Sequence, residues 1–112
     1  MVYCMLEKDI EAKGSKFAKE RGLEHYKFTS PNRRSVPDRL VLGYILPEHR
    51  TIVSQYVRFI EYKKPGGLLT IGQAKELGRL TELGFKADVA DSVELVEKLM
   101  KGMNGEKTKR ST

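Results

Sequence analysis

The fold follows most directly from residues 52–90, IVSQYVRFIEYKKPGGLLTIGQAKELGRLTELGFKADVA. The segments 52–63 and 85–90 are rich in β-branched and aromatic residues, which is typical of strands. Between them, Thr70 and Gln73 match the S/T-x-x-E/Q pattern of a capping box, and Gly84 marks the end of the helix predicted over 70–83. A strand–helix–strand unit predicts that its two strands lie parallel in one sheet.

The flanking sequence adds further elements on both sides of this unit. It predicts a helix over about 5–22, strands over 25–29 and 38–46, and a last helix capped by Asp91 with Glu94 three residues on. The short polar connection PEHRT (47–51) favours an antiparallel hairpin of strands 38–46 and 52–63. The order α-β-β-β-α-β-α predicts an α/β fold in which helices flank a mixed central sheet.

Length and composition indicate one globular domain. The chain has 112 residues, of which 39% are hydrophobic and 32% are charged, and no apolar run reaches the roughly 20 residues of a membrane helix. We expect a domain over 1–100 and a basic, disordered tail over 101–112. Cys4 is the single cysteine, so no internal disulfide can form and a cytoplasmic setting is expected. The formal net charge of +6 is compatible with an anionic partner such as DNA.

The chemistry-bearing residues lie in two short motifs, Pro37-Asp38 and Glu61-Tyr62-Lys63. Because side chains alternate along a strand, Glu61 and Lys63 share one face, and the predicted hairpin would bring Asp38 within reach of Glu61. Two carboxylates beside a lysine favour an Mg²⁺ or Mn²⁺ site acting on a phosphodiester. An acid and a lysine two residues apart are nevertheless common on ordinary strands.

A longer set of motifs resembles a known family. The segments EKDIE, KFTSP, VPDR, FIEYKKPGG, T-x-x-Q and LGF, spread between Glu7 and about Val96, resemble the virus-type replication-repair nuclease (VRR-NUC) domain. That family belongs to the PD-(D/E)xK nuclease superfamily, whose restriction-endonuclease-like core has the element order predicted above.

The resemblance implies a role for each matching residue. Asp38 and Glu61 correspond to metal ligands, the backbone carbonyl of Tyr62 to a further ligand, and Lys63 to the catalytic lysine. Gln73 matches a glutamine that faces the active site in this family. Its capping-box role explains the same residue without catalysis, and the two roles can coexist.

The first helix is expected to supply one more carboxylate. The spacing of Glu11 from Gly22 is similar to that in the archaeal Holliday-junction resolvases of this superfamily, so the resemblance favours Glu11. Glu7 is the alternative, since residues four apart share a helix face. Basic residues near the motifs are candidate DNA contacts, and the best placed are Lys16, Arg34 and Lys64.

Three other positions limit this interpretation. Ser35 stands where the family often has glycine before V-P-D, a departure that concerns the loop conformation rather than the chemistry. His25 and His49 are isolated and lack the spacing of metal ligands.

The resemblance implies an Mg²⁺- or Mn²⁺-dependent DNA endonuclease that is structure-specific and of the Holliday-junction-resolving type. Cutting two strands symmetrically calls for a homodimer. Replication, recombination or repair in a phage, inside the bacterial host cell, is the implied setting. A restriction-type, sequence-specific nuclease and a catalytically silent DNA-binding domain remain the alternatives.

Overall fold

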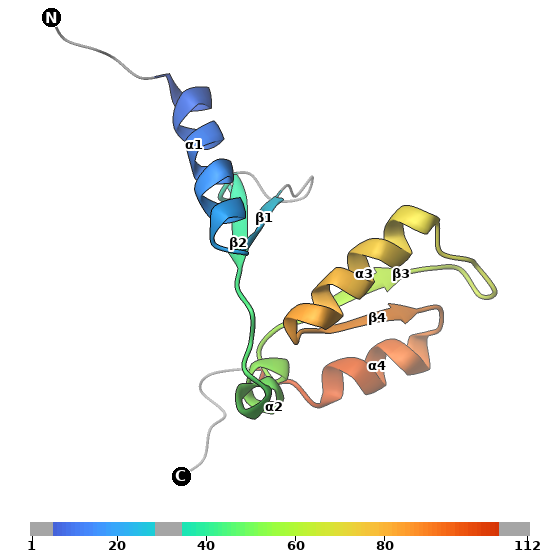
Figure 1. Ribbon diagram of the computed structural model, residues 1–112. Helices are drawn as coiled ribbons and strands as arrows, with labels where there is room; N and C mark the ends of the chain where they lie inside the picture. The colour runs from blue at the N-terminus through green and yellow to red at the C-terminus, as the bar shows by residue number, and fades with distance from the viewer. Residues whose placement is uncertain (1–5, 29–34, 106–112) are drawn as a thin grey trace, which may run out of the picture. The chain divides into compact units, whose positions relative to one another are not determined.

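The computed structural model describes residues 6–28 and 35–105, and the chain divides into two compact units, Met1–Tyr44 and Ile45–Thr112. Figure 1 shows the elements along the chain. In order, they are α1 (Glu7–Glu20), β1 (Glu24–Lys27), β2 (Arg39–Leu42), the 3₁₀ turn η1 (Pro47–His49), α2 (Arg50–Ser54), β3 (Arg58–Tyr62), α3 (Ile71–Leu83), β4 (Lys86–Ala90) and α4 (Val93–Lys101). None of the helices in the described ranges is long and apolar enough to cross a membrane.

The first unit is a helix followed by two antiparallel strands. Strands β1 and β2 pair in the register Tyr26↔Leu40. Helix α1 ends where Gly22 takes a positive φ of 69°, and the N–H of Leu23 then donates to the Ala18 carbonyl at 2.9 Å. This turn directs the chain into β1, and among the described residues of the unit Ala18 and Leu42 are the buried ones.

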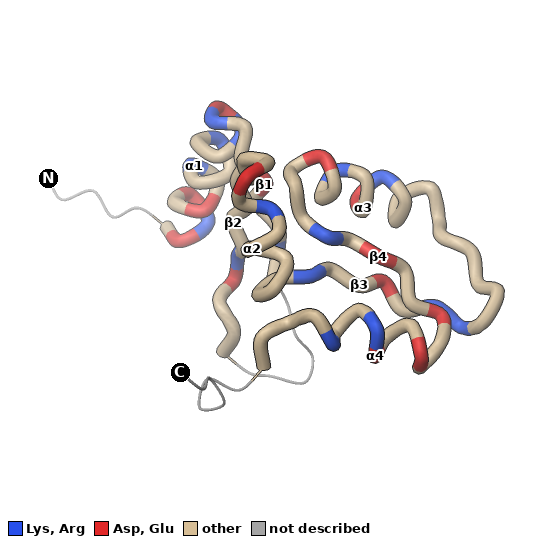
Figure 2. Tube along the Cα trace, turned by 90° about the horizontal axis from the view of Figure 1, so that it is seen from below, with Lys and Arg blue, Asp and Glu red and all other residues tan. Residues whose placement is uncertain are grey.

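The second unit is built on the parallel pair β3–β4, with Glu61 opposite Val89 and Tyr62 opposite Ala90. Helix α3 connects the two strands, and α3 and α4 lie on opposite sides of them (Figures 1 and 2). The rings of Phe59 and Phe85 meet edge to face, with their centroids 5.5 Å apart. The parallel strand–helix–strand arrangement predicted from the sequence is therefore confirmed.

Both ends of α3 form as the sequence predicts. The side chain of Thr70 accepts a hydrogen bond from the backbone N–H of Gln73, and the Gln73 side chain accepts one from the backbone N–H of Thr70. At the other end, Gly84 takes a φ of 105°, and a Cβ there would lie 2.6 Å from Nε of Arg50. Glycine is required at this position for both conformation and space.

The predicted hairpin of 38–46 and 52–63 is wrong. Strand β2 pairs with β1, residues 47–54 are helical, and the strand that follows begins only at Arg58. The N–H of Ile45 donates to the carbonyl of Leu83 at 2.7 Å, and Nε of Arg50 donates to the carbonyl of Ile45 at 3.0 Å. These contacts anchor residues 45–50 at the end of α3, so they cannot continue a strand.

Two smaller differences concern the sheet and the last helix. The described residues form two separate two-stranded sheets, where the sequence predicted one mixed central sheet. The N-cap of α4 is Ser92, whose Oγ accepts from the N–H of Leu95, so the prediction of Asp91 as the cap is wrong by one residue. Serine and aspartate cap helices equally well, and the backbone conformation decides between such neighbours.

Candidate functional site

The first unit brings Glu11 and Asp38 to the wall of one cavity of about 500 Å³, which Glu7 and His25 also line. Helix α1 contributes the two glutamates one turn apart. Asp38 directly precedes β2, and its carbonyl accepts from the N–H of Phe28 at 2.8 Å, which extends the β1–β2 ladder to this residue. The ladder therefore holds the backbone of Asp38 against the strand that follows α1.

An arginine distinguishes Glu11 from Glu7. Nε of Arg39 donates to Oε2 of Glu11 at 2.6 Å, and the exposed fractions of the two side chains are 30% and 42%. This hydrogen bond, together with the positive charge of Arg39, lowers the pKa of Glu11. Glu11 is thus held as a carboxylate beside Asp38, the state in which it could bind a cation.

His25 also lines this cavity. The sequence interpretation did not place His25 at the site. Its Nδ1 lies 3.0 Å from Oγ of Ser15. Ser15 lies four residues after Glu11, so the helical spacing places both on the same face of α1. The sequence carries no comparable signal for His25, because its contact with Ser15 joins β1 to α1.

In the second unit, Glu61 lies on β3 and is held by Gln73 of α3. Nε2 of Gln73 donates to Oε2 of Glu61 at 3.2 Å, while Oε1 of Gln73 accepts from the N–H of Thr70 at 3.0 Å. One side chain thus caps α3 and orients the carboxylate at the same time. The two roles that the sequence left open for Gln73 are structurally compatible.

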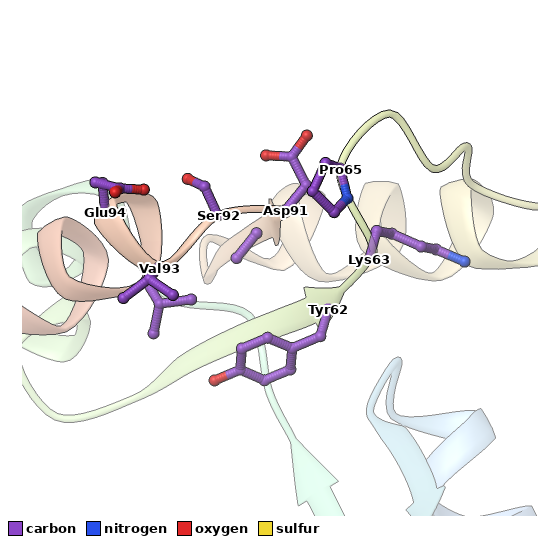
Figure 3. A pocket seen from close by; sticks show the side chains of 9 residues that line it. Tyr62, Lys63, Pro65, Asp91, Ser92, Val93 and Glu94 are labelled. Atoms are coloured by element: carbon purple, nitrogen blue, oxygen red, sulfur yellow. The ribbon is translucent and has the colours of Figure 1, made fainter.

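Lys63 and Tyr62 lie at the carboxyl end of β3. They contribute to a second cavity of about 560 Å³, which Asp91 of the β4–α4 connection and Val93, the first residue of α4, also line. Figure 3 shows the side chains of Tyr62 and Lys63 leaving the chain in different directions. Glu61 lines a different cavity of about 470 Å³, with Gln73 and Glu76 of α3, so the alternation that would place Lys63 on the side of Glu61 stays a prediction.

The backbone pairing of β3 also orients the carbonyl of Tyr62. The N–H of Lys63 donates to the carbonyl of Ala90 at 2.9 Å, so Lys63 directs its backbone polar groups toward β4. In a parallel ladder alternate residues point to opposite sides. The carbonyl of Tyr62 consequently faces away from β4 and is not used in that ladder.

The donor set suits a hard divalent cation, because every predicted ligand offers oxygen. Glu11 and Asp38 belong to the first unit, and Glu61 and the Tyr62 carbonyl belong to the second. Within residues 6–28 and 35–105, no group of three His, Cys, Asp or Glu side chains is arranged to hold a metal ion. Each unit by itself therefore supplies part of the predicted ligand set.

The structure describes two of the three residues that were predicted to contact DNA. Lys16 is exposed on α1, and Lys64 is exposed in the loop after β3. Arg34 lies outside the described residues.

Comparison with known proteins gives one informative similarity. Over 70 residues the chain is 46% identical to a protein of Acyrthosiphon pisum secondary endosymbiont phage 1 that carries the name "Putative nuclease p44". The match covers 62% of this chain and 66% of the phage protein, slightly less than two thirds of that protein's length. No protein-family model matches the chain, and no solved structure is significantly similar to it.

Proposed function

We propose that this chain is a metal-dependent DNA nuclease of the VRR-NUC type with a PD-(D/E)xK core. The name of the phage protein supports a nuclease, and the V-P-D and E-Y-K motifs support the finer assignment. The structural observation that carries the proposal is the cavity lined by both Glu11 and Asp38, because the sequence motifs assign both residues to metal binding.

The cofactor of the proposed reaction is Mg²⁺ or Mn²⁺, held by carboxylate oxygens of Asp38 and Glu61, by the Tyr62 carbonyl and by Glu11. Such an ion supplies polarisation of the phosphodiester and a lowered pKa for a bound water. All four groups offer hard oxygen donors, in accordance with the preference of both metals.

The protein's own side chains orient and neutralise the reactants. Gln73 donates to Glu61 and so restricts the rotation of that carboxylate. The ammonium of Lys63 orients the attacking water and offsets the negative charge that accumulates on the phosphate. The water oxygen forms a new bond to phosphorus, the phosphodiester P–O bond breaks, and the departing oxygen takes up a proton.

Branched DNA, such as a four-way junction, is the proposed substrate, and a homodimer is the proposed active form. The net charge of +6 favours binding to the DNA backbone. Symmetric incision of two strands needs two active sites, which a two-fold dimer provides.

Cleavage assays on defined DNA test this proposal. End-labelled four-way junctions, flaps and linear duplexes are incubated with the full chain, with Mg²⁺, with Mn²⁺ or with EDTA. We expect cleavage of the branched substrates only when a metal is present. The Asp38→Ala and Glu61→Gln variants should lose at least about 100-fold in rate and still bind the junction, because each removes a metal ligand.

Exposed carboxylates elsewhere in the chain provide the matched controls. Glu20→Gln at the end of α1 and Glu97→Gln on α4 remove the same charge from each unit and should leave the rate unchanged. Cleavage in EDTA, or full activity of Asp38→Ala, would overturn the assigned metal site. Sequence-specific cutting of linear duplex would favour the restriction-type alternative, and junction binding without any cutting would favour the silent one.

A further inference from the structure

The loop between β3 and α3 carries two strongly exposed apolar side chains. Leu68 is 87% exposed and Ile71, the first residue of α3, is 80% exposed, the highest values among the large apolar side chains in the described ranges. Water contact with so much apolar surface is unfavourable, and exposed apolar patches commonly mark binding sites.

The loop has a defined conformation at its start. The N–H of Gly67 donates to the carbonyl of Lys64 at 2.9 Å, and Gly66 takes a φ of 77°. A Cβ at Gly67 would lie 3.0 Å from the carbonyl oxygen of Lys64 and 3.3 Å from Cβ of Lys63. The two glycines therefore allow a tight turn directly after Lys63.

The end of the loop is tied to the candidate site. Thr70 caps α3 together with Gln73, and Gln73 also donates to Glu61. Leu68 lies two residues before Thr70, and Ile71 directly follows it. Both therefore lie close to the capping residues Thr70 and Gln73, through which the loop is connected to Glu61. The distance between the apolar side chains and the carboxylate is thus restrained by the protein.

Basic residues surround this apolar pair. Lys63 and Lys64 are the first two residues of the loop, and Lys75 lies four residues after Ile71, on the same face of α3. Figure 2 shows uncharged chain between the basic residues that follow β3 and those of α3. A DNA base stack is apolar, and the phosphates that border it are negatively charged. Lysines next to a pair of apolar side chains complement such a surface.

A second copy of this chain fits the loop less well. It would place the lysines of its own loop, Lys63 and Lys64, opposite the same lysines of this loop. Like charges placed opposite one another oppose such a contact.

We propose that Leu68 and Ile71 form an apolar wedge that enters an interrupted DNA base stack while Lys63 and Lys64 contact the adjoining phosphates. This inference rests on the proposed nuclease function and names the feature of DNA that the loop recognises. Apolar side chains that insert at a base step must unstack it, and unstacking is least unfavourable where the stack is already broken. A branch point or a flap junction provides such a break.

Fluorescence of 2-aminopurine placed at the branch point of a four-way junction tests the wedge. The full chain is added in EDTA, so that binding is measured without cleavage. We expect the wild-type chain to raise the fluorescence by unstacking the probe and the Leu68→Ser/Ile71→Ser variant to leave it near the value of free DNA. That variant should bind the junction about tenfold more weakly and linear duplex as before.

Two matched variants separate a wedge from general hydrophobicity. Ile52→Ser/Met100→Ser removes two other exposed apolar side chains of the second unit and should keep the full signal. Leu68→Met/Ile71→Met retains apolar bulk and should also keep it. An unchanged signal in the serine variant, or a lost signal in the methionine variant, overturns the wedge.

Light scattering tests the competing explanation, in which Leu68 and Ile71 form a contact between two copies of the chain. If the serine variant is monomeric where the wild-type chain is dimeric, Leu68 and Ile71 are a contact between copies and the wedge is wrong.

A wild-type chain that cuts junctions without raising the fluorescence overturns the wedge alone. A chain that raises the fluorescence but cuts nothing with Mg²⁺ or Mn²⁺ overturns the nuclease alone, and a chain that does not bind the junction overturns both.

Discussion

At the scale of single residues, the most informative position is Ser35. It takes a φ of 64°, in the left-handed region that glycine occupies without a steric penalty. The resembled family often has glycine at this position, so the backbone conformation suits that residue type although the side chain differs. A conformational cost of this kind persists only where the surrounding structure imposes it.

Replacing Ser35 by glycine should therefore stabilise the protein. Relief of the left-handed strain is worth about 1–2 kcal/mol, and the greater entropy of glycine in the unfolded chain offsets part of it. We expect a net gain of about 0.5–1 kcal/mol in the free energy of unfolding, measured by urea denaturation.

Gly66→Ala tests the same backbone preference in the opposite direction, because it introduces a side chain at a positive φ. Gly66 has a φ of 77°, and a Cβ there would meet no atom within 4 Å, so the substitution changes the backbone preference alone. It should lower the free energy of unfolding by about 1 kcal/mol. A loss of stability in Ser35→Gly would contradict this account of Ser35.

At the scale of secondary-structure elements, the start of α3 has two functions. Thr70 and Gln73 satisfy backbone groups at the first turn, and Gln73 additionally donates to Glu61. A helix cap that also orients a site carboxylate couples the stability of the helix to the geometry of the site. The two contributions can be separated, because only Gln73 contacts Glu61 among the two capping residues.

Thr70→Ala and Gln73→Ala should differ in their effects on cleavage. Thr70→Ala removes the capping oxygen and should lower the free energy of unfolding by about 1 kcal/mol, while the turnover rate of junction cleavage stays unchanged. Gln73→Ala should lower stability to a similar extent and also lower the turnover rate, because Glu61 loses its donor.

Ser92→Ala provides a control for helix capping alone. Its Oγ accepts from the N–H of Leu95 at the start of α4, and its loss should affect stability only. Equal rates for Gln73→Ala and Thr70→Ala would limit Gln73 to capping.

At the scale of the whole molecule, the excess of basic residues is the feature that bears on the proposed binding of DNA. The chain has 21 Lys and Arg against 15 Asp and Glu. Lysines that contact phosphates release counterions on binding, so they set the salt dependence of affinity rather than sequence preference. Lys16 and Lys64 lie on different units, and both are exposed.

Lys16→Gln and Lys64→Gln should each reduce the salt dependence of junction binding. The slope of log affinity against log salt concentration is expected to become shallower by about 1 for each lost phosphate contact. Fluorescence anisotropy between low and physiological salt measures this slope. Lys98→Gln, at an exposed position on α4, should leave it unchanged, and an equal change in all three variants would contradict the assigned contacts.

Local patterns were sufficient to predict most of the second unit. The capping box at Thr70 and Gln73, the end of α3 at Gly84 and the parallel strands around it depend on residues close together in sequence. The alternation that predicts Glu61 and Lys63 on one side of β3 is equally local, because it follows from strand geometry, but in the structure the two residues line different cavities. The motifs at Asp38 and Glu61 were likewise visible in the sequence alone.

Pairing between distant segments was decided only by the tertiary structure. Residues 52–54 contain β-branched residues and resemble the start of a strand, but hydrogen bonds from Ile45 and Arg50 anchor the preceding chain near the end of α3. The convergence of His25 with Glu11 and Asp38 on one cavity likewise joins three separate elements. Contacts of this kind depend on which partner each backbone group finds in space, which no short window of sequence specifies.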